Sequence, residues 1–351
     1  MTVTGSGGAA STVTTTVTAS GGASNQTLIQ QAQAECAGVS TCLTIYSTVD
    51  ATDWAADFSG LFNASFPWAA GKVNFQGLTS GQVTSEGISQ YQAGKVQADL
   101  FIATLGVIEP LVSAGAIQNW SNPLIPLMNY SKGAYDPQGA WTVSFISIVG
   151  LQYNTQQISS TQASQLTWNS LANSTYKGKV GFQTATSISA TAGLFYYLST
   201  QMSNSSWTSL MNGIAANQPV ITSSASTTTN NIATGQIALG IGLYNDYLEA
   251  QKSGSPIGMV FPSPAIYNPG VQSIAKNAPH PAMAQLVSEW LIGSQGQLGF
   301  AISNRTPYQT AIALQYHLVP PGIVLNNAYQ NPKIFSNTAA WSDQMKSIFG
   351  A

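Results

Sequence analysis

The feature that most limits what this chain can fold into is a repeated order of a short β-rich run, a polar turn and a helical pattern. Residues 43–46 form the first such run, and apolar positions at helical spacing follow over 53–62. Strands that alternate with helices of this length predict a parallel sheet covered by helices. The expected fold class is therefore α/β, with ligands held beyond the carboxyl ends of the strands. Further β-rich runs begin similar units at 73–76, 99–103, 179–182, 218–222 and 237–242.

The units fall into two sets, one on each side of residues 141–153. This segment is nearly continuous apolar and β-branched sequence, long enough to run from one folded unit into another. A chain of 351 residues also exceeds a single core of ordinary size and can hold two. Hydrophobic residues make up 44% of the chain, which is enough apolar surface for most of it to be globular. We therefore expect two lobes.

Charged residues are scarce. They make up 6% of the chain, against about 25% in an average soluble protein. With 10 Lys and Arg against 12 Asp and Glu, the chain has no basic stripe to neutralise a run of phosphates, which argues against a nucleic-acid partner. Acid unfolding follows mostly from protonation of paired carboxylates and self-repulsion, so we expect tolerance of acidic surroundings. The alternative is a neutral surface without any adaptation to acid.

Several features indicate a location outside the cytoplasm. Cys36 and Cys42 lie close together with no His near them for a metal site. A disulfide between them implies an oxidising compartment, and two buried free thiols are the alternative. The chain contains no run of 18 apolar residues, so nothing in it is expected to span a bilayer. Residues 1–24 are mostly Thr, Ser, Gly, Ala and Val, which predicts a flexible tether, and an export signal or anchor is expected upstream of Met1.

Asn-X-Ser/Thr sequons permit a glycosylated exterior without requiring one. In a chain this rich in Asn, Ser and Thr several of them arise by chance. They begin at Asn25, Asn63, Asn119, Asn129, Asn173, Asn204 and Asn304.

Five segments resemble a known family in the same order along the chain. Trp168 and Leu171, followed by KGKVGF at 177–182, are similar to its passage into the second lobe. WT at 141–142 with YNT at 153–155 is similar to its inter-lobe strand. GQIALG at 235–240, APHPA at 278–282, and SQGQ at 294–297 with RTP at 305–307 are similar to three later segments. Over about residues 43 to 310 the chain thus resembles the solute-binding proteins of ABC importers, in particular the branch that includes ferric-iron binders.

The resemblance implies a fold and a function. The fold is the type II periplasmic-binding-protein clamp, with two discontinuous lobes joined by hinge strands and the ligand between them. By this resemblance lobe one is 43–142 plus 262–308, and lobe two is 143–261 plus 309–351. The protein closes on a small molecule as the lobes rotate, and it then docks on an ABC permease in the membrane. The resemblance implies no chemistry and no cofactor, and we expect an extracellular monomer, tethered to the cell surface or secreted.

Polar side chains gather in the turns that follow the predicted strands. Hydroxyls and the free N–H groups of helix starts are what such clefts use to hold polar solutes. Any single Ser or Thr in these turns can equally be a helix cap, so the prediction depends on their convergence. The predicted ligand-binding residues are Ser47, Thr48, Asp50, Thr79, Ser80, Thr104, Ser147, Thr186, Ser187, Ser189, Ser224, Tyr244, Asp246 and Tyr247.

The metal site of the ferric-iron branch is not intact in this chain. Those binders use a His after the first strand, a Glu after the third strand and two adjacent tyrosines. Carried over by position, the His and Glu places fall on Asp50 and Thr104, and the tyrosines fall near Asn245 and Asp246. Asp50 and Asp246 are carboxylates that could still ligate a hard cation, with Tyr244 and Tyr247 as further oxygen ligands.

The anion side of that site also departs from the family pattern. Ser147 stands where many relatives place an Arg, and the single Arg of the chain is Arg305. Helix starts and hydroxyls would then have to hold an oxyanion, whereas Trp54, Trp141 and Tyr244 could stack on a sugar. A sugar or polyol, an oxyanion and a metal all stay open as the solute.

Two other classes of function fit the sequence less well. A hydrolase is disfavoured because the chain has only two His and lacks the G-x-S-x-G, HExxH, P-loop and G-x-G-x-x-G motifs. A structural coat or filament protein would also be exported and low in charge, but it should show repeated β-sandwich strands instead of alternating strands and helices.

Overall fold

The computed structural model describes residues 23–49, 51–128, 130–186, 189–329 and 338–350. The predicted tether over 1–22, Asp50 and Ser187 lie outside these residues. Ala23 and Ser24, also expected in the tether, begin helix α1 (Ala23–Glu35). No helix in the described ranges is both long enough and apolar enough to cross a membrane.

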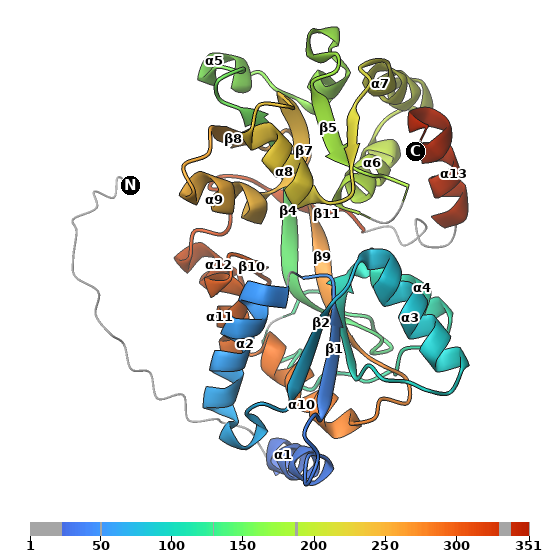
Figure 1. Ribbon diagram of the computed structural model, residues 1–351, viewed down its shortest axis with the longest axis vertical. Helices are drawn as coiled ribbons and strands as arrows, with labels where there is room; N and C mark the ends of the chain where they lie inside the picture. The colour runs from blue at the N-terminus through green and yellow to red at the C-terminus, as the bar shows by residue number, and fades with distance from the viewer. Residues whose placement is uncertain (1–22, 50, 129, 187–188, 330–337, 351) are drawn as a thin grey trace, which may run out of the picture.

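The predicted units of strand, turn and helix are present in both halves of the chain (Figure 1). In the first half, 141–153 was expected to be a long strand, and β4 confirms it. The elements are β1 (Leu43–Ser47), α2 (Ala51–Ser65), β2 (Val73–Gly77), α3 (Ser80–Gln92), β3 (Leu100–Thr104), α4 (Leu105–Ser113) and β4 (Thr142–Asn154).

The second half repeats this order and then returns to the first part of the molecule. Its elements are α5 (Ser160–Ala163), β5 (Val180–Gln183), α6 (Ala190–Gln201), α7 (Asn204–Ala216), β6 (Val220–Thr222), α8 (Ala225–Ala233), β7 (Leu239–Leu243), α9 (Tyr244–Lys252) and β8 (Ile257–Val260). The returning elements are β9 (Ala265–Ile274), α10 (Pro281–Ile292), α11 (Ser294–Ile302), β10 (Thr306–Pro307), α12 (Thr310–Gln315), β11 (Leu325–Asn327) and α13 (Thr338–Phe349).

The strands join into one hydrogen-bonded sheet in the order β2-β1-β3-β9-β4-β7-β5-β6. β1, β2 and β3 are parallel to one another, and so are β5, β6 and β7. β4 and β9 run antiparallel between the two sets, with Ser147 paired to Asn268 near the midpoint. Figure 1 shows these two long strands passing from the lower part of the molecule to the upper part. The mixed sheet and its helices are not the β-sandwich that a coat protein would need.

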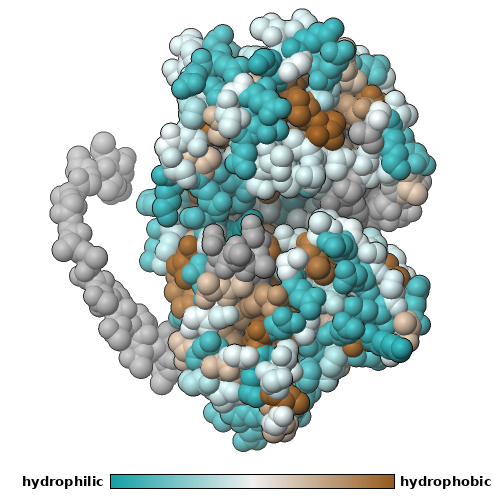
Figure 2. Space-filling model, in the orientation of Figure 1, coloured by the Kyte–Doolittle hydropathy of each residue, from teal (hydrophilic) through white to brown (hydrophobic). Residues whose placement is uncertain are grey.

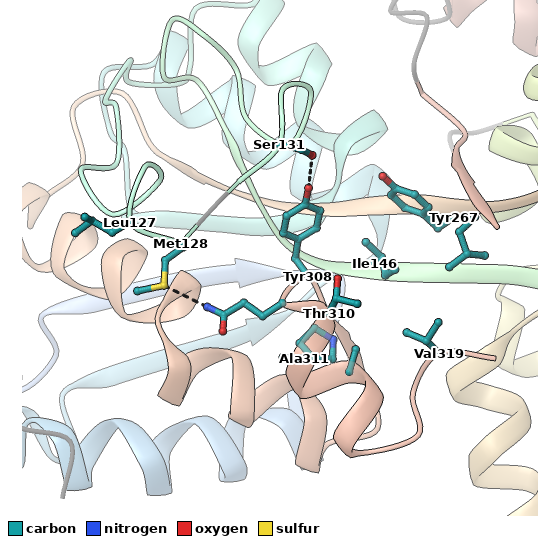
Figure 3. A pocket seen from close by; sticks show the side chains of 13 residues that line it. Leu127, Met128, Ser131, Ile146, Tyr267, Tyr308, Thr310, Ala311 and Val319 are labelled. Carbon is teal, nitrogen blue, oxygen red and sulfur yellow. Dashed lines mark hydrogen bonds between the residues drawn. The ribbon is translucent and has the colours of Figure 1, made fainter. Parts of the chain in front are cut away.

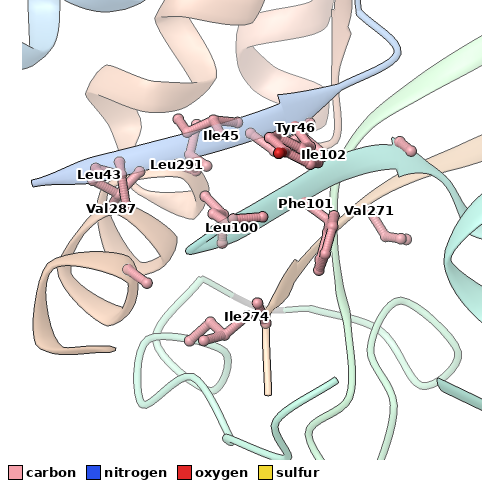
Figure 4. Close-up of a cluster of buried hydrophobic side chains, with 14 of the residues drawn as sticks. Leu43, Ile45, Tyr46, Leu100, Phe101, Ile102, Val271, Ile274, Val287 and Leu291 are labelled. Atoms are coloured by element: carbon pink, nitrogen blue, oxygen red, sulfur yellow. The ribbon is translucent and has the colours of Figure 1, made fainter. Parts of the chain in front are cut away.

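The buried side chains form two large clusters, one in each part. The first contains Val143 and Phe145 of β4 with Val271 and Ile274 of β9, and the second contains Val149 and Leu151 of β4. We call the parts built around these clusters lobe one and lobe two. Figure 4 shows the centre of the first cluster, where side chains of β1, β3, β9 and α10 meet: Leu43, Ile45, Leu100, Ile102, Ile274, Val287 and Leu291.

The final segment does not belong to one lobe throughout. α12 packs against α11 and β10 beside lobe one, whereas α13 packs against α7 in lobe two. The expected boundary assigned all of 309–351 to lobe two. The position of α12 follows from the short connection that leads to it from β10, which is paired with β4.

The predicted disulfide is present at the base of lobe one. Cys36 and Cys42 are bonded with their Cα atoms 5.3 Å apart, within the usual range for a disulfide. Lys72 fixes the loop by donating from Nζ to the carbonyl oxygens of Cys36 and Val39, at 3.0 and 2.6 Å. The Glu35 carboxylate accepts the amides of the first turn of α10, so α1 and the disulfide loop are joined to the body of the lobe.

Candidate functional site

A cleft of about 660 Å³ lies where the parallel strands of both lobes end. Residues that follow β1, β2 and β3 line it from lobe one, and residues that follow β5, β6 and β7 line it from lobe two. Ser147 of β4 and Asn268 of β9 line its floor. Figure 2 shows the molecule hollowed between its upper and lower parts, with mostly hydrophilic and neutral residues beside the hollow. The sheet topology thus brings the ends of six strands to one site.

Many of the predicted ligand-binding residues line this cleft together. They come from both lobes and from a hinge strand, although they are spread over two hundred residues of sequence. They are Thr48, Thr79, Ser80, Thr104, Ser147, Ser189, Ser224 and Asp246.

Four other predicted residues do not line the cleft. Ser47 is 1% exposed, and its Oγ accepts the amide of Val49 in the turn after β1. The hydroxyl of Thr186 is 2.9 Å from the hydroxyl of Thr184. Tyr244 and Tyr247 of α9 stack on each other with ring centroids 6.0 Å apart and are not among the lining residues.

Three of the lining hydroxyls cap helices. Ser189 Oγ accepts the amide of Ala192 in α6, and Ser224 Oγ accepts the amide of Thr227 in α8, both at 3.1 Å. Thr79 forms a capping box with Gln82 at the start of α3. These caps hold α3, α6 and α8 with their first turns at the cleft, where the earliest N–H groups of a helix have no acceptor within the helix.

Several lining residues were not predicted from the sequence. Arg305 was noted as the single Arg but was not assigned to the site, and Glu249 lies one turn beyond Asp246 on α9. Asn268 was not predicted because β9 was not recognised as a second hinge strand. The other missed polar residues are Gln82, Gln183, Ser226 and Ser303.

Comparison with known families identifies the chain. Residues 97–322 match the family described as bacterial extracellular solute-binding protein, which is more than half of the chain. The protein belongs to this family. No curated protein sequence matches it.

Solved structures share the two-lobed fold of this solute-binding protein. Iron-bound HitA from Pseudomonas aeruginosa superposes with a TM-score of 0.72 at 15% identity, covering 87% of this chain and 99% of that one. Apo ferric ion-binding protein A from Pasteurella haemolytica gives 0.69 at 18% identity over 87% and 98%. AfuA from Actinobacillus pleuropneumoniae with fructose-6-phosphate bound gives 0.67 at 19% identity over 89% and 97%. The type II periplasmic-binding-protein fold expected from the sequence is confirmed.

The charged side chains of the solute-binding cleft are few. Arg305 and Asp246 are half-buried and Glu249 is exposed, and these three are the charged residues among those that line it in the described ranges. Across the described residues, no three His, Cys, Asp or Glu side chains gather as a metal would require. Asp246 and Glu249 are the acidic residues of this lining.

Two of the predicted aromatic stackers, Trp141 and Tyr244, are not among the residues that line the cleft. Trp141 packs beside the first cluster and donates from Nε1 to Glu109 at 3.2 Å. Tyr244 lies edge-on to Phe261, with centroids 5.5 Å apart. The side chain of Trp54 lies outside the described residues. Phe145 is the aromatic residue of the cleft lining that the structure describes.

A second cavity, of about 720 Å³, lies on the other face of the hinge strands (Figure 3). Successive side chains of a strand point to opposite faces, so Ile146 and Tyr267 line this rear cavity while Ser147 and Asn268 line the cleft. Tyr308 stands in it with its hydroxyl 2.7 Å from that of Ser131. Burial raises the pKa of Tyr267 to about 12, with the neighbouring Tyr308 as a further cause.

Proposed function

We propose that this protein works outside the cell membrane, where it captures a small polar solute between its lobes and presents it to the permease of an ABC importer. Membership of the solute-binding family supports ligand capture for import. The observation that carries the proposal is the cleft of about 660 Å³ at the ends of six strands, a volume usual for small-molecule sites. The protein acts as a binding protein and not as an enzyme.

The proposed mechanism is rotation of the lobes about β4 and β9. A solute that contacts both lobes favours the closed form by the difference between its contacts in the closed and open forms. Residues of lobe one, such as Thr48 and Ser80, and residues of lobe two, such as Ser224, would then contact the same molecule.

The proposed location is the outer cell surface, either tethered or secreted. The disulfide Cys36–Cys42 supports an oxidising compartment. Asn119, Asn173 and Asn204 of the sequons are exposed, so glycosylation there is sterically feasible. We also propose that the protein tolerates acidic surroundings and is a monomer.

A thermal-shift screen tests this function. Purified protein is heated with a panel of sugars, oxyanions, metal ions and amino acids, and a solute present at one hundred times its Kd should stabilise the folded state by about 2.7 kcal/mol. Small-angle scattering with the best solute should show a smaller radius of gyration. A panel in which no solute raises the melting temperature would contradict the proposed function.

A further inference from the structure

The charges that line the cleft are divided by sign between the lobes. Arg305 comes immediately before β10, beside lobe one, whereas Asp246 and Glu249 lie on α9 of lobe two. No other charged residue of the described ranges lines the cleft. In a chain with only 6% charged residues, the cleft thus has its positive side chain on one lobe and its negative side chains on the other.

The pairing of β4 places these two sides next to each other at the hinge. Val149 pairs with β9 on one edge and with Leu243, the last residue of β7, on the other. Ile146 pairs with β9 on the first edge and with Thr306 of β10 on the second. β7 and β10 therefore follow each other along one edge of β4, three residue steps or about 10 Å apart. α9 begins directly after Leu243 and Arg305 comes directly before Thr306, so both lie in the interval between these strands.

α9 also contacts the segment that follows Arg305. The hydroxyl of Tyr244 donates to the carbonyl of His317, just after α12, at 3.4 Å. Figure 1 shows α9 directly above α12 and β10. Asp246 and Glu249 are three residues apart, so they project from one face of α9, and both line the cleft. A rotation of the lobes about β4 and β9 therefore changes the distance between this face and Arg305.

Glu249 is the acidic side chain of this face that can pair with Arg305. The Asp246 carboxylate already accepts a hydrogen bond from the side chain of Asn245 at 2.6 Å. Across the part of the chain that the structure describes, neither Arg305 nor Glu249 takes part in an ion pair. Glu249 is exposed and Arg305 is half-buried, so little desolvation would oppose their pairing. Their attraction grows as the two lobes approach.

We propose that Arg305 and Glu249 form an ion pair between the lobes when the clamp closes, and that they act as positioning residues for the closed form. This inference rests on the proposed function, in which the lobes rotate about β4 and β9. An interaction made only in the closed form shifts the equilibrium toward that form, whichever solute is bound. An exposed pair of this kind shifts the equilibrium by up to about fivefold.

Spin labels on the two lobes test the proposal without any solute. Ser89 on α3 and Asn230 on α8 are exposed and do not line the cleft, so Ser89→Cys with Asn230→Cys gives one label site on each lobe. Cys36 and Cys42 are bonded to each other and do not react with the label. Double electron–electron resonance measures the distribution of distances between the labels. The closed form gives the shorter distances, because α3 and α8 begin on opposite sides of the cleft.

Four variants isolate the ion pair. Arg305→Gln and Glu249→Gln should each lower the population of shorter distances at least about twofold. The double variant should lose no more than either single variant, because each change alone already removes the pair. The exchange of the two charges, Arg305→Glu with Glu249→Arg, should restore at least about half of the loss. The matched control Lys252→Gln, which removes an exposed charge of α9 outside the cleft lining, should leave the distribution unchanged. Circular dichroism and the melting temperature show that each variant is folded.

The outcomes separate this inference from the proposed function. The same distance distribution in the parent protein, both single variants and the exchanged variant would overturn the inference. So would losses that add in the double variant, because the two charges would then act separately. The proposed function would still stand in either case if a solute of the thermal-shift panel raises the melting temperature. A panel without any such solute contradicts the proposed function, whatever the label distances show.

Discussion

The cleft and the rear cavity lie on opposite faces of the same two hinge strands, and their linings differ. The cleft, of about 660 Å³, is lined largely by Ser, Thr and amide side chains with one Arg and two carboxylates. The rear cavity, of about 720 Å³, is lined by aliphatic and aromatic residues with a few hydroxyls and amides. Their difference comes from single steps along the strands, Ile146 to Ser147 and Tyr267 to Asn268.

One pair of strands thus presents a polar face to the cleft and a more apolar face to the rear cavity. β4 and β9 form a wall of both cavities. If the lobes rotate about these strands as proposed, we expect a rotation that narrows the cleft to widen the rear cavity. The polar residues of the cleft gain hydrogen bonds with a solute when the cleft narrows. Widening of the rear cavity is unfavourable because it exposes more apolar surface to water. Leu127, which lines this cavity, is already 70% exposed. The two faces therefore bias closure in opposite directions.

The largest expected effect comes from filling the cleft. Ala190 is half-buried at the start of α6 and lines the cleft. Ala190→Trp places an indole in front of the helix N-terminus and between the lobes. We expect at least about a hundredfold loss of solute affinity, or about 2.7 kcal/mol, measured by titration calorimetry.

Ala190 lines the cleft but also packs against the second cluster, so the fold of the variant has to be checked. The melting temperature of the variant without solute is the control. Full affinity in a folded Ala190→Trp variant would show that the solute binds elsewhere, and the contrast between the two cavities would lose its functional meaning.

The next effect concerns pH and the helix that covers the hinge strands. α10 packs against β9 and β4 and carries Glu289, which is 6% exposed. Burial raises the pKa of Glu289 from 4.5 to about 7. Between these values the folded state holds a proton that the unfolded state releases, so stability should rise as the pH falls from 7 toward 4.5. We expect a gain of about 2 kcal/mol in the free energy of unfolding, measured by urea denaturation.

Glu289→Gln should flatten this part of the pH profile. The sign matters for the expected tolerance of acid, because here a buried carboxyl stabilises the protein as it is protonated. A free energy of unfolding that falls between pH 7 and 5 in the parent protein, or the same rise in the Glu289→Gln variant, would refute the role of Glu289.

The parts of the cleft that could be predicted from the sequence are those whose structure is determined by neighbouring residues. Thr79, Ser189 and Ser224 follow short β-rich runs and precede helical patterns, and a helix cap at such a place must lie at the strand end. The strand β4 was also expected, from a nearly continuous apolar and β-branched run whose ends resemble the inter-lobe strand of the family. These features are set by residues that are neighbours in the sequence.

The missed parts depend on long-range contacts. β9 reads AIYNPGVQSI, and Pro269 and Gly270 in its middle argue against a strand in isolation. It forms because β4 and β3 pair with it on both sides, from segments more than a hundred residues away. Asn268 reaches the cleft through this pairing, and Arg305 reaches it through the pairing of β10 with β4. Tyr244 and Tyr247 were predicted for the cleft from their place after a β-rich run and from the resemblance to the family. They are not among the residues that line it, because the direction in which a helix presents its side chains decides what they contact.

The smallest effect comes from filling the rear cavity, and it has the opposite sign to that of Ala190→Trp. Ala311 is exposed on α12 and lines the rear cavity, so a larger side chain can enter without disturbing a packed core. An indole in Ala311→Trp resists narrowing of the rear cavity and thereby favours the closed cleft on the other face. We expect about three- to fivefold tighter solute binding, or up to about 1 kcal/mol, with most of the change in the dissociation rate. Surface plasmon resonance measures both rates. Weaker binding in Ala311→Trp would mean that closure of the cleft does not widen the rear cavity, because a bulky side chain in the rear cavity should otherwise favour the closed cleft.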